Sequence, residues 1–101
     1  MNTSSLINEA KAKFNFNLAK VQLKEKYQNK LIVADQGGLW KITPDLLAFA
    51  ATSNQDTIIL IDTYDNPVEV NRNDFLYKLD AVYSAVMQEY LAEWNKLKAI
   101  R

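Results

Sequence analysis

The spacing of apolar residues predicts a long helix at the start of the chain. Ser4 or Ser5 can cap it, and no proline or glycine follows before Asn29, so we expect the helix to run to residue 27 or 28. An apolar stripe at intervals of three and four predicts its buried face: Ile7, Ala10, Phe14, Leu18 and Val21. Phe16 and Leu23 lie off this stripe, where they either widen the buried face or contact a partner.

A second long helix is predicted over residues 71–101. Asn71 can cap it, and Asp74 occupies the third helical position, as in a capping box. Its apolar residues alternate by three and four, with one seven-residue step: Leu76, Leu79, Tyr83, Val86, Tyr90 and Leu97. Glu93 interrupts the second heptad position, which favours a mixed, partly polar contact over a continuous coiled coil. At about 1.5 Å per residue the helix exceeds about 40 Å, so we expect its distal half to extend beyond the body of the domain.

Short apolar runs between the helices predict strands. Residues 31–34 and 39–42 flank Asp35-Gln36-Gly37-Gly38, whose paired glycines can supply the positive φ of a hairpin turn. Thr43-Pro44 predicts a short helix to about residue 52. Residues 57–61 form an unbroken apolar run, which predicts a central strand buried on both faces, and residues 68–70 pair with it. We therefore predict a single α+β domain over residues 1–101, in which an antiparallel sheet of about four strands packs on helices.

The composition is that of an ordinary globular domain, with 49% apolar and 24% charged residues, and it limits the chemistry. The chain contains no cysteine and no histidine, which removes disulfides, zinc-thiolate sites, cysteine nucleophiles and histidine bases. We therefore expect no enzymatic activity and no cofactor. The polar start of the chain and the shortness of its most apolar run predict no membrane partner and a cytoplasmic location.

Two segments resemble ligand sites weakly. Asp62 and Asp65 follow the predicted central strand and could hold Mg²⁺, but Asp and Asn ahead of Pro67 are also typical of a turn, which we favour. Gly37-Gly38 lacks the spacing and the Lys-Ser/Thr pair of a phosphate-binding loop. The adjacent Trp40 is either a core side chain, which we favour, or an exposed anchor for a partner.

The charge is unevenly distributed although the net charge is zero. Residues 1–30 carry a net charge of +4, residues 31–70 of −5 and residues 71–101 of +1. A lysine-rich first helix leaves open a nucleic-acid-binding regulator as an alternative function. Its candidate contact residues are Lys11, Lys13, Lys20, Lys24 and Lys26. The scarcity of arginine, the usual reader of bases and phosphates, argues against this alternative.

The last helix carries more apolar surface than a small sheet can cover. Our leading hypothesis is therefore a non-enzymatic protein–protein interaction or assembly protein that uses this helix. The partner is either another protein or a second copy in a homo-oligomer. The predicted contact residues are Met87, Tyr90, Leu91, Trp94, Leu97 and Ile100.

Three segments also resemble a known group of proteins. Lys-Leu-Ile-Val-Ala-Asp-Gln-Gly-Gly-Leu-Trp at 30–40, Ile-Asp-Thr-Tyr-Asp-Asn-Pro-Val at 61–68 and the aromatic helix at 90–94 are similar to segments of small proteins of T-even-like tailed phages, including cyanophages. The resemblance implies a phage-encoded accessory or virion protein, located in the host cytoplasm or the virion. It implies no site residues.

Overall fold

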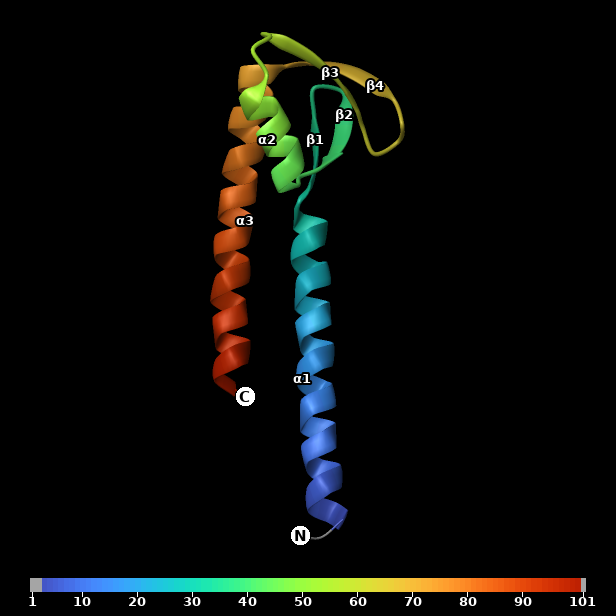
Figure 1. The fold of residues 1–101 in the computed structure, drawn as a ribbon, viewed down its shortest axis with the longest axis vertical. Coiled ribbons are helices and arrows are strands. Elements are labelled where there is room, and N and C mark those ends of the chain that lie inside the picture. The colour runs from blue at the N-terminus through green and yellow to red at the C-terminus, as the bar shows by residue number, and fades with distance from the viewer. Residues whose placement is uncertain (1–2, 101) are drawn as a thin grey trace.

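The computed structural model describes residues 3–100, which form three helices and two hairpins. The elements are α1 (Thr3–Lys30), β1 (Ile32–Asp35), β2 (Gly38–Lys41), α2 (Pro44–Thr52), β3 (Thr57–Ile61), β4 (Pro67–Asn71) and α3 (Arg72–Ile100). Figure 1 shows the hairpins and α2 gathered at one end, which we call the head. From the head, α1 and the distal half of α3 run side by side in opposite directions, and we call this pair the arm. The α+β class and the order of elements are as predicted.

The strands form two separate two-stranded antiparallel sheets, so the prediction of a single four-stranded sheet is wrong. The loop after β3 occupies the free edge of β2 instead of another strand. The backbone N–H and the hydroxyl of Thr63 both donate to the carbonyl of Leu39, each at 2.9 Å. The Leu39 N–H in turn donates to the Asp62 carboxylate at 3.2 Å. Loop groups thus satisfy the edge that a strand would otherwise have paired.

The strand β3 is covered on one face only. Ile58 is buried, whereas Ile59 and Ile61 are 70% and 62% exposed. The prediction that this strand is buried on both faces is therefore wrong. A hairpin with no second layer over its outer face cannot bury alternate residues, whatever their hydrophobicity.

In the turn between β1 and β2, the positive φ values lie at Gln36 and Gly37, not at both glycines as predicted. Asp35 pairs with Gly38, which leaves a two-residue turn. The two turn residues, Gln36 and Gly37, have φ values of 49° and 84°, as a type I′ turn requires. Gly38 is needed for space rather than for φ, because an ideal Cβ there would lie 2.5 Å from Cζ2 of Trp40.

The core lies where the head meets the two long helices. Trp40 is buried and packs edge-on against Phe75 at 5.1 Å between ring centres, which confirms the core interpretation of Trp40. Thr43 caps α2 by accepting a hydrogen bond from the N–H of Leu46, as predicted. The buried apolar residues are Tyr27, Leu31, Trp40, Ile42, Ala50, Ile58, Val70, Phe75, Leu79 and Val86.

Both long helices form, but α1 contains Ser4 and Ser5 within its first turn, so neither occupies its N-cap position, and it ends at Lys30, beyond the predicted residue 27 or 28. It is also rotated from its expected orientation. The Asn71 side chain caps α3 through the N–H of Asp74. On α1, Leu23 and Tyr27 face the core. Ile7, Ala10, Phe14, Leu18 and Val21, the stripe expected to be buried, are all exposed. Phe16 and Tyr27, which lie off that stripe, make the contact with α3 through the rings of Trp94 and Tyr90.

Candidate protein-interaction surface

The arm is held together by aromatic pairs between α1 and α3. Tyr27 and Tyr90 stack in parallel with their ring centres 5.1 Å apart, and Phe16 lies 6.2 Å from Trp94 in a tilted arrangement. Such pairs contribute about 0.5–1.5 kcal/mol each beyond the burial of their area. The arm is therefore a paired element, and the distal half of α3 leaves the head without standing free.

Glu93 forms the polar part of the contact between α1 and α3. Its Oε1 accepts hydrogen bonds from the Tyr27 hydroxyl and from the Lys26 ammonium, the latter at 2.8 Å. The hydrogen bond from Lys26, reinforced by that from Tyr27, lowers the pKa of Glu93. The same carboxylate raises the pKa of Tyr27 to about 12, chiefly by accepting its hydrogen bond. The heptad break that Glu93 makes in the sequence is thus filled by a polar contact within the chain.

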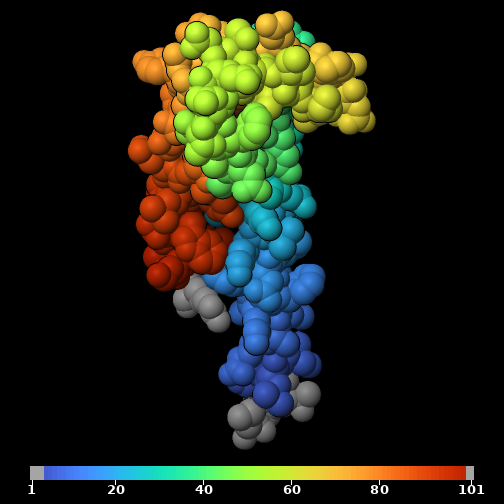
Figure 2. All heavy atoms as spheres, turned by 45° about the horizontal axis from the view of Figure 1, so that its top comes forward, coloured from blue at the N-terminus to red at the C-terminus, as the bar shows by residue number. Residues whose placement is uncertain are grey.

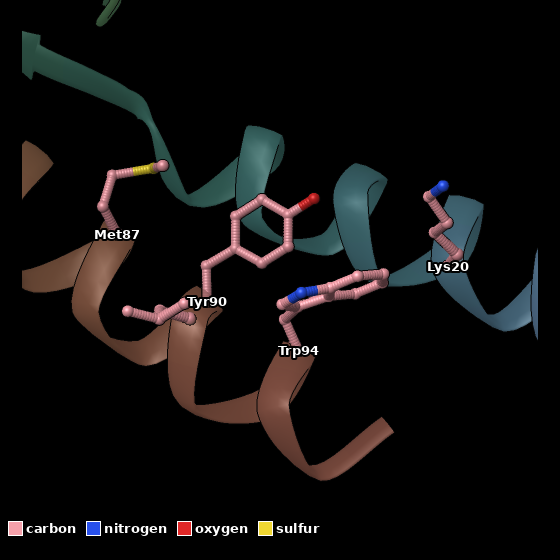
Figure 3. Close-up of a pocket in the computed structure, with 5 residues that line it drawn as sticks. Lys20, Met87, Tyr90 and Trp94 are labelled. Atoms are coloured by element: carbon pink, nitrogen blue, oxygen red, sulfur yellow. The ribbon is translucent and has the colours of Figure 1, made fainter. Parts of the chain in front are cut away.

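The predicted contact residues on α3 line the side of the arm. Met87, Tyr90, Trp94 and Leu97 are partly buried, whereas Leu91 is 59% exposed. The side chain of Ile100 lies outside the part of the chain whose side chains the structure describes. A groove of about 280 Å³ is lined by Lys20, Met87, Tyr90, Leu91 and Trp94 (Figure 3). Most of the predicted α3 set therefore serves the contact with α1, and Leu91 is its most exposed described member.

A further apolar surface of the arm is the outer face of α1, which we define as Ile7, Ala10, Phe14, Leu18 and Val21. At 3.6 residues per turn, Phe14 and Val21 lie about half a turn round the helix from Phe16 and Leu23, which contact α3. Phe14 is 65% exposed and Val21 is 52% exposed. The sequence displays this stripe clearly, but sequence reasoning assigned it to the core, whereas the structure leaves it exposed.

The N-terminal part of α1 also projects past the end of α3, as the space-filling view shows in blue (Figure 2). The principal extents of the molecule are 66, 25 and 19 Å, so it is elongated along the arm. The outer face runs along both the projecting part and the part that is paired with α3. It is therefore accessible along its whole length.

Of the five candidate lysines of α1, three share one face of the helix and two do not. Lys26 pairs with Glu93, and the Lys20 ammonium lies 5.7 Å from the centre of the Trp94 ring. At 100° per residue, Lys13, Lys20 and Lys24 lie within about 40° of one another, whereas Lys11 and Lys26 point to other sides. The shared face is therefore a short row of three lysines, one of which lies over an aromatic ring of α3.

The loop that contains Asp62 and Asp65 is a hydrogen-bonded turn. The buried carboxylate of Asp62 accepts from the backbone N–H groups of Tyr64, Asn66 and Leu39 at 2.9, 3.0 and 3.2 Å. These bonds, led by that from Asn66, lower the pKa of Asp62. Asp65 has a positive φ of 62° within the same turn. Among the described residues, no three acidic, histidine or cysteine side chains converge as metal ligands would. The geometry thus favours the turn interpretation.

Comparisons with known protein families, with curated proteins and with solved structures find no match. The resemblance to phage proteins therefore stays a prediction. Within residues 3–100, none of the helices combines the length and the apolar character that crossing a bilayer requires.

Proposed function

We propose that this protein is a non-enzymatic interaction or assembly protein that docks on a protein partner through its arm. The observation that carries the proposal is the outer face of α1, a helical stripe of apolar side chains, all large except Ala10, that is left in solvent. Scattered apolar residues are normal on a protein surface, but a contiguous stripe is typical of a binding site. The proposal moves the main contact surface from α3 to α1 and keeps Leu91 and its groove as a neighbouring surface.

The free energy available at this face is of the right size for recognition. Fully burying a Val, Leu, Ile or Phe side chain contributes about 1.5–3 kcal/mol. Ile7, Phe14, Leu18 and Val21 are each about half exposed, so a partner that covers them gains roughly 3–6 kcal/mol. Association itself costs about 4 kcal/mol or more. A stable complex therefore requires a partner that brings an apolar face of its own.

The setting of this interaction follows from the resemblance to proteins of tailed phages. We extend the proposal to an accessory or virion component, for which assembly through helices is a suitable mode of action. The nucleic-acid alternative has less support, because Lys26 is paired with Glu93 and Lys20 lies over the Trp94 ring, which leaves a short basic row.

The test is the size of the native complex in an extract of the source cells, treated with nuclease and measured by sedimentation. We expect the wild-type protein to sediment well above its 11.6 kDa chain mass and Phe14→Glu to shift it to the monomer position. The control is Tyr77→Glu, which places the same charge at an exposed aromatic residue of α3 away from the outer face of α1. Monomeric sedimentation of the wild-type protein would overturn the proposal. A large species that nuclease dissolves would favour the nucleic-acid alternative.

A further inference from the structure

We infer that the partner of the outer face of α1 is a second copy of this chain, paired antiparallel with Phe14 facing Phe14 across a two-fold axis. The inference rests on the proposed function and names its partner.

The surface area of the chain fits a dimer better than a monomer. The accessible surface is 7343 Å². A compact monomer of 11.6 kDa is expected to expose about 5,800 Å², so this chain exposes about 1,500 Å² more. Its radius of gyration is 19.4 Å, against about 13 Å for a compact domain of this length. A standard interface buries about 800 Å² per partner. The excess is therefore enough to supply one side of such an interface.

The order of residues on the outer face is complementary to itself in the antiparallel direction. With Phe14 at the centre, Ile7 faces the partner's Val21, and Ala10 faces the partner's Leu18. The small side chain of Ala10 thus lies opposite the larger Leu18, and the branched Ile7 lies opposite the branched Val21. The seam from Ile7 to Val21 is about 21 Å long at 1.5 Å per residue. Because each copy contributes its stripe, the apolar gain is counted twice and reaches roughly 6–12 kcal/mol. That gain exceeds the lower range of association costs.

The charges beside the stripe select the antiparallel direction. Glu25 and Lys11 lie at the same angular position as the stripe or next to it. A parallel pair would place Glu25 opposite the partner's Glu25 and Lys11 opposite the partner's Lys11, and like charges so placed repel. In the antiparallel pair Lys11 faces the partner's Asn17, and Glu25 approaches the first turn of the partner's α1. That turn contains no acidic residue of its own, so its positive dipole end is complemented from the other copy.

Disulfide trapping in the purified full-length protein tests both the partner and the direction, because the chain has no cysteine of its own. Phe14→Cys places one thiol on each side of the two-fold axis, within the short reach of a disulfide. We expect it to give a covalent dimer under mild oxidation. The matched control, Asn15→Cys, is one residue away on an exposed site off the stripe, and we expect at least tenfold slower dimer formation.

Two further samples test the register. Because they keep Phe14, they remain informative even if Phe14→Cys itself weakens the dimer. Ile7→Cys mixed with Val21→Cys should give the mixed dimer, while Ile7→Cys alone should stay at the control rate. Rapid dimer formation by Ile7→Cys alone would overturn the antiparallel arrangement. Control rates in all samples, with a monomeric mass by light scattering, would overturn self-association. In that case a large, Phe14-dependent species in the cell extract would still support docking on a different protein, so the two failures are distinguishable.

Discussion

Replacing Gly38 by alanine introduces a methyl group directly against the indole ring of Trp40. The ideal Cβ position is 2.5 Å from Cζ2, 2.8 Å from Cε2 and 3.1 Å from Nε1 of that ring, whereas carbon atoms pack at about 3.5–4.0 Å. The ring has little freedom to retreat, because it is buried against Phe75 and its Nε1 donates to the carbonyl of Asp35 at 2.9 Å.

The expected cost of Gly38→Ala combines overpacking with a weakened hydrogen bond. Overpacking of a filled core costs about 1–3 kcal/mol, and a lost hydrogen bond adds about 1 kcal/mol. We expect destabilisation of about 2–4 kcal/mol, which lowers the Tm of a domain of this size by at least about 8 °C. Thermal unfolding followed by circular dichroism measures this shift, and near-ultraviolet dichroism reports the displaced Trp40.

The matched control is Gly37→Ala, where an added Cβ meets nothing within 4 Å but the backbone has a φ of 84°. The left-handed conformation costs alanine about 1–2 kcal/mol, and the loss of glycine's freedom in the unfolded chain returns about 0.4–1 kcal/mol. Gly38→Ala should therefore be clearly the more harmful change. Equal or reversed effects would refute the argument that Gly38 is required for space.

Further predictions concern the core, the cap of α3 and the hydrogen bond between Tyr27 and Glu93. Leu79→Ala should cost about 2–5 kcal/mol in urea unfolding, because Leu79 is fully buried; a smaller loss would mean that the head repacks. Asn71→Ala should cost about 1 kcal/mol through loss of the cap, and Asn73→Ala, two residues along the chain, should be nearly neutral. Ionised Glu93 has a lowered pKa, so its stabilisation should be complete above its usual value of 4.5 and lost as the pH falls through the folded-state pKa. The raised pKa of Tyr27 makes stability fall with rising pH. The stabilisation from its protonated hydroxyl is complete below pH 10.0 and is lost as the pH rises to about 12. Melting curves across pH should show a smaller acid limb in Glu93→Gln, with the contribution of Asp62 remaining, and an unchanged acid limb would contradict the assignment.

The local elements were predictable because their signals are local. Thr43-Pro44 and Asn71 are capping residues, and the structure shows each in that role. The β1–β2 turn follows from Gly37, although the positive φ at Gln36 does not. Its side chain exchanges hydrogen bonds with the backbone of Asn71, a partner 35 residues away, and that long-range contact compensates for an unfavourable local conformation.

The arrangement of the elements was harder to predict because it depends on which of two faces is covered. The first helix is apolar on opposite sides, and periodicity alone favoured the side with Phe14 over the side with Phe16 and Leu23. In the structure, Tyr27 stacks on Tyr90, and the side with Phe16 and Leu23 lies against α3. Similarly, the apolar run of β3 is equally compatible with a central strand and with an exposed Ile59. Hydrophobic pattern indicates which faces need cover, but only tertiary contacts determine which faces receive it.

The molar mass of the purified protein tests self-association through the outer face of α1 most directly. Sedimentation equilibrium is suitable because it is independent of the elongated shape. Over a micromolar concentration range we predict a rise from 11.6 kDa to twice that mass, and a mass that stays at 11.6 kDa for Phe14→Glu with an unchanged helical spectrum. A wild-type protein that remains at 11.6 kDa throughout, or a dimer that Phe14→Glu leaves intact, would contradict self-association through this face.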